Sequence, residues 1–281
     1  MTLVAENCYV RATDGALLRF EHRDAGPGAR GVVVTLHGLG EHVGKYEEWF
    51  DALLAAGYHV YAYDQRGHGR TPGRRGDYAF GDLVADLERF LAVVGDRHAG
   101  APLLVVAHSL GALVALRWAR EAGEEAPVAG IVLSSPPLEL AERPPAWFRW
   151  GVRALAAIAP RLPLPRRTDP SRLTRDPERV AAIESDPLAH RAMTPRAMTT
   201  TAAAMEELRE APPPRGIPML ILAAGEDRVA DSSTTLAWAR SAEDGRMTVG
   251  RVPGAYHELL NDLGREATFR QILEWCGERV G

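Results

Sequence analysis

The sequence predicts an α/β fold in which helices cover both faces of a mostly parallel β-sheet. Several continuous apolar runs, rich in valine, leucine and isoleucine, are typical of strands buried on both faces. Segments with apolar residues at helical spacing lie between these runs, and this alternation is characteristic of a parallel sheet. The clearest junction is Pro102–Gly111, where a buried strand passes into a helix with almost no connecting chain.

The remaining elements can be placed in chain order. Residues 8–23 alternate in polarity around Asp14-Gly15, which predicts a tight β-hairpin. Further apolar or buried strands are expected at Gly31–His37 and His59–Asp64, and further strands at Val128–Ser134, Pro218–Ala223 and Met247–Val252. Helices are expected at Tyr46–Ala56, Phe80–Val94, directly after Ser109, at Ser232–Ala242 and at Glu266–Arg279.

The regular alternation stops near residue 135 and resumes near residue 213. A long insertion between two strands of such a sheet is expected to fold over the carboxyl ends of the strands, where these sheets bind ligands. We therefore predict a helical cap at residues 135–213 on a core made of residues 1–134 and 214–281.

An aromatic stripe marks one helix of the predicted cap. Trp147, Trp150, Leu155 and Ile158 share one helical face. The stripe is expected to pack against the core. The alternatives are an apolar substrate entrance, in which Trp147 and Trp150 would contact substrate, and a shallow contact with a membrane surface.

Composition narrows the class of protein. The net charge of −4 argues against a nucleic-acid-binding surface, and 46% hydrophobic residues can build a sizeable core. Cys8 and Cys276 stand alone, without a metal or redox motif, and the amino-terminal residues do not resemble a signal peptide. We expect a cytoplasmic protein without a membrane span, a metal or a cofactor. Lys45 is the only lysine, which we interpret as compositional bias.

Ser109 lies where the strand reverses into the helix. This position is typical of a nucleophile elbow, in which the hydroxyl stands clear of the sheet and the amide of Leu110 points to the same space. Gly111 provides the small neighbour that the close approach needs, and Ala107 stands where a glycine is usual. A simple helix N-cap is the alternative interpretation of Ser109.

A serine nucleophile needs a base and a carboxylate that orients the base. His257 follows the strand at Met247–Val252, and Asp227 follows the strand at Pro218–Ala223. Both are therefore expected at the sheet edge that carries Ser109. Asp231 is a competing carboxylate that we expect to cap the next helix, and Glu226 is expected to point away.

The loop after the strand at Gly31–His37 is a candidate for the oxyanion hole. Its glycines, Gly38 and Gly40, let the backbone approach closely, and we predict Leu39 N–H and Leu110 N–H as the two donors.

These motifs resemble the α/β-hydrolase family of monoacylglycerol lipases and bacterial lysophospholipases. The resemblance rests on His37-Gly38-Leu39-Gly40-Glu41-His42, Asp64-Gln65-Arg66-Gly67-His68-Gly69, Ala107-His108-Ser109-Leu110-Gly111, Asp227-Arg228 and Ala255-Tyr256-His257. It covers nearly the whole chain. It implies the α/β-hydrolase fold, with an eight-stranded sheet and a helical cap after the sixth strand. It also implies cofactor-free hydrolysis of monoacylglycerols by Ser109, His257 and Asp227.

Further residues near the motifs are candidates for substrate contact. Glu41 and His42 could bind a glycerol hydroxyl or lie on the surface. His108 is expected on the wrong side of the turn for a base but could line the pocket, as could Gly38.

Other functions stay open. Within the enzyme class, a lysophospholipase or a medium-chain carboxylesterase is the main alternative. A peptidase would need acidic cap residues, for which Glu139, Glu142 and Glu184 are available. Outside the enzyme class, the alternative is a non-catalytic ligand-binding protein with the same fold. Acyl chain length, head group and oligomeric state are not predicted.

Overall fold

One eight-stranded sheet organises the protein in a computed structural model that describes residues 8–165, 169–242 and 245–280. Across the sheet the order is β1-β2-β4-β3-β5-β6-β9-β10. The pairs β1–β2 and β2–β4 are antiparallel, and all pairs from β4 onward are parallel. The strands are β1 (Tyr9–Arg11), β2 (Leu17–Arg23), β3 (Gly31–Leu36), β4 (Tyr58–Tyr63), β5 (Leu103–His108), β6 (Gly130–Ser134), β9 (Met219–Ala224) and β10 (Met247–Val252).

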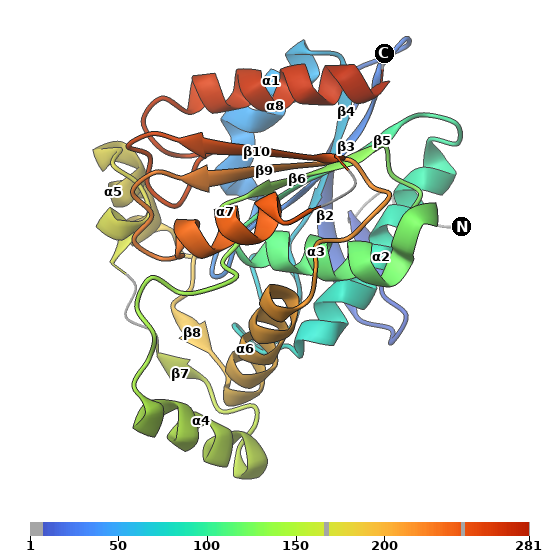
Figure 1. Ribbon diagram of the computed structural model, residues 1–281. Coiled ribbons are helices and arrows are strands. Elements are labelled where there is room, and N and C mark those ends of the chain that lie inside the picture. The colour runs from blue at the N-terminus through green and yellow to red at the C-terminus, as the bar shows by residue number, and fades with distance from the viewer. Residues whose placement is uncertain (1–7, 166–168, 243–244, 281) are drawn as a thin grey trace.

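Helices cover both faces of this sheet, as predicted (Figure 1). On one face lie α1 (Glu47–Ala55) and α8 (Arg265–Val280). On the other lie α2 (Phe80–Arg97), α3 (Leu110–Ala122) and α7 (Ser232–Arg240). Each face has its own apolar cluster, because the central strands bury side chains on both sides. The eight-stranded α/β-hydrolase sheet expected from the resemblance is confirmed.

The predicted elements are all present, and their ends differ by a few residues. The helix expected from Tyr46 is preceded by a 3₁₀ turn, Val43–Tyr46, and α1 begins at Glu47. Helix α2 continues to Arg97, three residues beyond the predicted end. A second 3₁₀ turn, Gly123–Glu125, follows α3. The predicted absence of a signal peptide concerns residues 1–7, which lie outside the described residues.

The segment between β6 and β9, where we predicted a helical cap, is not purely helical. It holds α4 (Ala146–Ile158), the short strands β7 (Leu164–Pro165) and β8 (Ala192–Met193), a 3₁₀ turn (Pro170–Arg172), α5 (Pro177–Ser185) and α6 (Pro195–Glu210). Strands of two residues carry no readable alternation, so sequence reasoning missed the β7–β8 ribbon.

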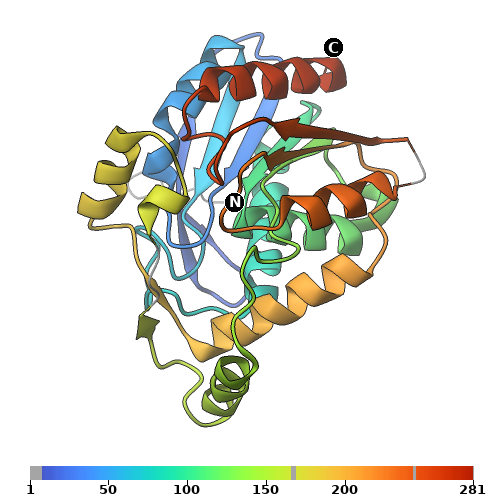
Figure 2. The same ribbon diagram turned by 60° about the vertical axis from the view of Figure 1, so that its left-hand side comes forward.

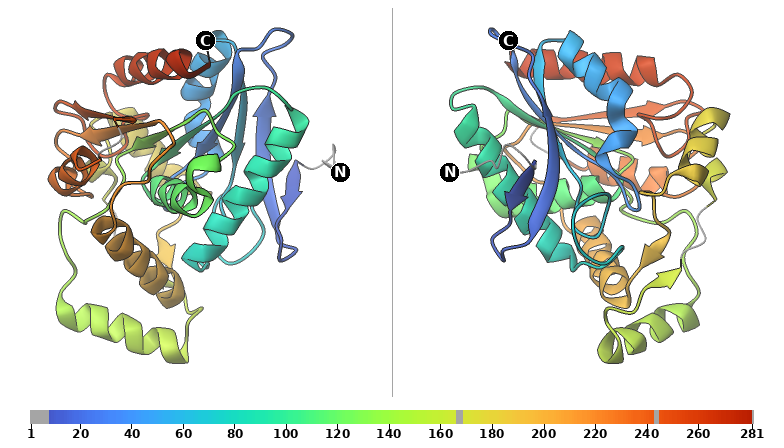
Figure 3. Two further views of the ribbon diagram at one scale, coloured as in Figure 1. Left: turned by 45° about the vertical axis from the view of Figure 1, so that its right-hand side comes forward. Right: turned by 180° about the vertical axis from the view of Figure 1, so that it is seen from behind.

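The aromatic stripe of α4 does not pack against the core, so that expectation is wrong. Helix α4 contacts α6, buries Val152 and stands away from the body of the molecule (Figures 2 and 3). Consequently Trp147 is 75% exposed, Trp150 is 68% exposed and Ile158 is 82% exposed.

Candidate active site

Ser109 occupies a sharp turn between β5 and α3. Its φ of 51° lies in the left-handed region, which costs a non-glycine residue energy and is typical of functional turns. A Cβ on Gly111 would lie 2.7 Å from the His37 carbonyl oxygen, so the glycine is needed where α3 meets the end of β3. Ser109 makes no capping hydrogen bond to α3, which rules out the N-cap alternative. Ala107 is fully buried without disturbing the turn.

The three side chains chosen from the sequence meet in one hydrogen-bonded series. His257 Nε2 lies 2.8 Å from Ser109 Oγ, and His257 Nδ1 lies 2.8 Å from Asp227 Oδ2. A carboxylate can only accept, so Nδ1 carries the proton and the neutral ring accepts the serine hydroxyl proton at Nε2. The Asp227 side chain is 1% exposed, and its other oxygen accepts N–H bonds from Val229 and Ala230.

Burial and the ion pair have opposing effects on the pKa of His257. Burial alone lowers this pKa, but the negative charge and the hydrogen bond of Asp227 outweigh burial, and the pKa is raised above 6.5. Burial raises the pKa of Asp227, but the charge of His257 and the hydrogen bonds from His257 and the two backbone N–H groups outweigh burial. The pKa is therefore lowered, and the carboxyl stays ionised. The arrangement therefore stabilises an imidazolium beside Ser109.

The competing carboxylates lie where the sequence predicts. Asp231 accepts from the backbone N–H groups of Ser233 and Thr234 and caps α7. Glu226 is exposed. Neither carboxylate makes a hydrogen bond to His257 in the described part of the chain, and Asp227 does.

The glycine loop after β3 abuts Ser109. A Cβ on Gly38 would lie 3.2 Å from the Ser109 Cβ, so this loop passes directly over the serine. Gly40 has a φ of 78° and its backbone carbonyl accepts from His190 N–H at 3.0 Å. Leu39 is held between these glycines, and Leu110 N–H stands in the first turn of α3, where no helical acceptor is available.

The chain is similar to several known proteins. A family model described as serine aminopeptidase, S33, matches residues 27–264. A monoacylglycerol lipase of Mycolicibacterium smegmatis is 31% identical over 254 residues, 88% of each chain. Phospholipase YtpA of Bacillus subtilis is 26% identical over 261 residues, 89% of this chain and 96% of the relative. The crystal structure of Paleococcus ferrophilus monoacylglycerol lipase has a TM-score of 0.84 at 29% identity, covering 93% and 99% of the two chains.

The chain belongs to the α/β-hydrolase family that this model describes and that includes these relatives. It is an ester hydrolase with the α/β-hydrolase fold. No helix among the described residues is long and apolar enough to cross a membrane. In the same part of the chain, no group of three or more histidine, cysteine, aspartate or glutamate side chains could hold a metal ion.

Several candidates for substrate contact have other partners in this hydrolase. Glu41 is 6% exposed, and it accepts from Gly38 N–H, Tyr46 OH and Lys45 Nζ, so it does not offer a free carboxylate to glycerol. His42 Nε2 is 2.5 Å from Asp186 Oδ2, so its ring is held by the segment between β6 and β9.

His108 is buried beside the His257 ring, with ring centroids 5.0 Å apart. Burial lowers its pKa to about 4, which makes it a weaker base than His257, and its Nδ1 lies 3.3 Å from Ser134 Oγ. Trp147 and Trp150 point to solvent on α4, and the structure does not bring them to Ser109.

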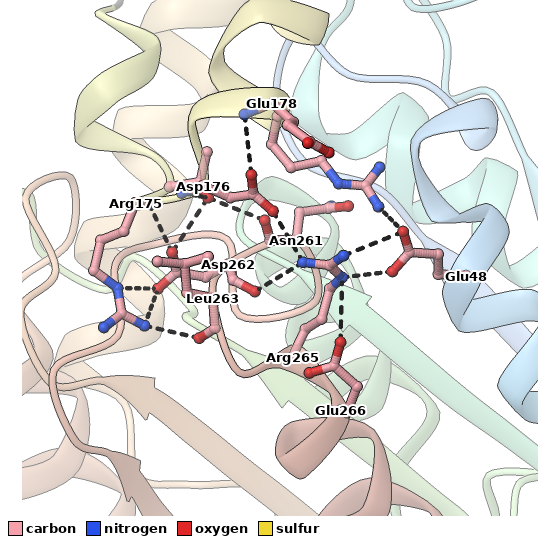
Figure 4. Close-up of polar contacts among 11 residues, drawn as sticks. Glu48, Arg175, Asp176, Glu178, Asn261, Asp262, Leu263, Arg265 and Glu266 are labelled. Carbon is pink, nitrogen blue, oxygen red and sulfur yellow. Dashed lines mark hydrogen bonds and ion pairs between the residues drawn. The ribbon is translucent and has the colours of Figure 1, made fainter.

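Sequence reasoning missed an anchor that joins the segment Thr174–Asp176 to the loop of His257 (Figure 4). Asp262, whose side chain is 1% exposed, accepts from Arg175 N–H at 2.7 Å and Arg175 Nε at 2.9 Å. It also accepts from the backbone N–H of Tyr256 at 2.8 Å, one residue before His257. No sequence signal identifies this contact, because its partners lie about eighty residues apart.

Proposed function

We propose that the hydrolase cleaves carboxylic esters of lipid-like substrates, monoacylglycerols first, through an acyl-enzyme on Ser109. The observation that carries the proposal is the hydrogen-bonded series of Ser109, His257 and Asp227. Ser109 Oγ attacks the ester carbonyl carbon while His257 Nε2 takes its proton. His257 then gives this proton to the departing alcohol, and water releases the fatty acid by the reverse sequence.

The tetrahedral intermediate carries negative charge on the former carbonyl oxygen. Leu39 N–H and Leu110 N–H are the donors that we propose for it. The loop of Leu39 passes over Ser109, and Leu110 follows Ser109 directly, which supports this assignment. Loss of one such donor typically costs about 3 kcal/mol of transition-state stabilisation.

The substrate class is supported by the names of the relatives and by the fold of the insertion. We propose that residues 135–213 form a cap over Ser109 and that the acyl chain lies beneath it. A lysophospholipase or medium-chain carboxylesterase is the alternative, because one relative carries the name phospholipase. A peptidase is less supported, since Glu139 is paired with Arg143 and Arg209, and Glu142 with Arg172.

Initial rates test the proposal. We expect hydrolysis of monoacylglycerols of one chain length to exceed that of matched lysophospholipids and simple alkyl esters. Ser109→Ala serves as the blank and is expected to lose turnover while it remains folded. A residual rate within about tenfold of the parent would contradict the role of Ser109. No activity on any ester would favour amide substrates or the non-catalytic binding protein.

We also propose that α4 makes a transient contact with an anionic lipid surface. Its exposed tryptophans stand beside the exposed arginines Arg149 and Arg153, and residues 143–165 contain no acidic side chain. Aromatic and basic side chains on one exposed helix favour the interface of an anionic bilayer. Co-sedimentation with anionic vesicles should fall on Trp147→Ala and Trp150→Ala, and unchanged binding would rule the contact out. The cytoplasmic location stays a prediction.

A further inference from the structure

The single lysine of the chain is nearly buried between two carboxylates. The side chain of Lys45 is 11% exposed, and those of Glu41 and Glu258 are 7% and 2% exposed. Lys45 Nζ lies 2.6 Å from Glu41 Oε1 and 2.8 Å from Glu258 Oε1. All other residues of the Lys and Arg type in this chain are arginines. We therefore look for the reason for a lysine in the surroundings of position 45.

Each carboxylate belongs to a different part of the proposed active site. The second oxygen of Glu41 accepts from Gly38 N–H at 2.7 Å and from Tyr46 OH at 2.7 Å, so Glu41 holds the loop of Leu39. Glu258 follows His257 directly in the chain, and its backbone N–H donates to the carbonyl of Leu173 at 2.9 Å. Lys45 is thus the bridge between the oxyanion loop and the base loop.

The bridge fits an ammonium group. An ammonium is a compact charge whose three donors rotate freely, and it can serve two carboxylates that approach from different directions. A guanidinium is planar and larger. It also joins two carboxylates elsewhere in this chain, as Arg66 joins Asp14 and Asp86, so the number of partners does not select the lysine. The compact size of the ammonium suits the nearly enclosed position between Glu41 and Glu258.

We propose that Lys45 is a positioning residue that fixes the oxyanion loop relative to His257 through Glu41 and Glu258. The inference rests on the proposed roles of Leu39 and His257. Loss of the bridge is expected to misalign the two loops and to slow the chemical step, with less effect on substrate binding. Small errors in alignment have large effects on rate.

The charges around Lys45 give Glu258 a titration that can be measured. Burial raises the pKa of Glu258 to about 7, against the attraction of Lys45 and with the repulsion of Glu41. Burial also raises the pKa of Glu41, but Lys45 and the hydrogen bonds hold that pKa well below its usual range. The described titratable groups that also interact with these carboxylates are Tyr46, His37, His68, His108 and His257.

A single-residue spectroscopic test follows from the composition. Lysine labelled with ¹³C and ¹⁵N gives one lysine side-chain signal in the full chain, because Lys45 is the only lysine. We expect this signal to shift with an apparent pKa near 7 and to lose that step in Glu258→Gln. A pH-independent signal at the position of a solvated lysine would overturn the bridge.

Kinetics test the consequence for the site. In Lys45→Met we expect kcat on the preferred ester to fall about tenfold or more, with KM little changed and an altered pH profile. Lys45→Arg restores the charge and should recover part of kcat. Arg66→Met is the matched control, because it likewise removes a cation that joins two carboxylates, here Asp14 and the buried Asp86, neither of which belongs to the loops of Leu39 and His257. If Lys45→Met loses stability like this control but keeps kcat and the pH profile, Lys45 is merely structural.

A probe that needs no particular ester separates this inference from the proposed substrate. A fluorophosphonate reacts with an activated serine, and its rate depends on both loops but not on the natural alcohol. Slower labelling of Lys45→Met, with recovery in Lys45→Arg, supports the positioning role even if monoacylglycerols are poor substrates. If the parent is not labelled at Ser109, the proposed catalysis fails, while the lysine signal still decides whether the bridge exists.

Discussion

Replacement of Asp262 by asparagine should destabilise the fold through the anchor of Figure 4. Asp262 uses one oxygen for Arg175 N–H and the Thr174 hydroxyl, and the other for Arg175 Nε and Tyr256 N–H. An asparagine offers one oxygen and one NH₂ group. With the NH₂ group on the side of Arg175 N–H, that N–H loses its acceptor, whereas the Thr174 hydroxyl keeps the Asn261 carbonyl oxygen at 3.0 Å. In the other orientation, Arg175 Nε and Tyr256 N–H both lose their acceptor. Both orientations remove the negative charge.

The magnitude follows from the lost acceptor of Arg175 N–H and from the lost charge. A buried donor without a partner costs about 1–3 kcal/mol, and the amide favours the orientation that leaves a single donor unpaired. We expect a loss of about 2 kcal/mol in the free energy of unfolding, or roughly 4–8 °C in Tm for a chain of this size. Burial raises the pKa of Asp262, but hydrogen bonds from Arg175, Tyr256 and Leu263 outweigh it and lower the pKa.

Thermal and urea unfolding of Asp262→Asn, of the control variant Glu48→Gln and of the parent measure this effect. The depressed pKa means that the stabilisation is present above the unfolded value of about 3.9 and is lost as pH falls through the folded value. The difference between parent and Asp262→Asn should therefore narrow below about pH 4. Glu48→Gln is the control at the exposed end of the same network, where we expect less than about 1 kcal/mol. An Asp262→Asn variant within about 1 kcal/mol of the parent at neutral pH would refute the reasoning.

Two further predictions concern the proposed catalytic residues and the turn that holds them. Because the pKa of His257 is raised by Asp227, kcat/KM should rise with pH as the imidazole loses its proton, at a value above 6.5. Asp227→Asn should lower kcat by several orders of magnitude and shift this limb to lower pH, and an unshifted limb would assign it to another group. Gly111→Ala should cost about 1–3 kcal/mol in stability, because its Cβ would lie 2.7 Å from the His37 carbonyl oxygen. Gly95→Ala, with nothing within 4 Å of the added Cβ, should stabilise α2 slightly in the same unfolding assay.

The order of strands and helices was predictable because each central strand is buried on both faces and is therefore mainly apolar. β5 and β6 have no exposed residue, and their sequences are apolar up to their last residues, His108 and Ser134. The insertion was harder to predict because its elements pack on different neighbours. α4 exposes its tryptophans, and a helical stripe of apolar residues has the same pattern whether it faces a core or solvent.

The residues proposed for catalysis were predictable because topology alone brings them together. Ser109, Asp227 and His257 each follow a parallel strand, and the carboxyl ends of parallel strands meet at one edge of the sheet. The partners of Glu41 and His42 could not be predicted, for the opposite reason. These partners, Lys45 and Asp186, are set by side-chain directions across loops, which a sequence pattern does not encode.

Lys45 shows what composition could have contributed. We interpreted one lysine among many arginines as a compositional bias of the whole chain. Such a bias explains the many arginines, but it does not explain why Lys45 is a lysine. Among the described residues, Arg23 and Arg172 are guanidinium groups that pair with one or two carboxylates at the surface. The lysine occupies a nearly enclosed position between two loops that both border Ser109. A lysine in a chain whose other basic residues are arginines therefore marks a position where the local environment requires that residue type.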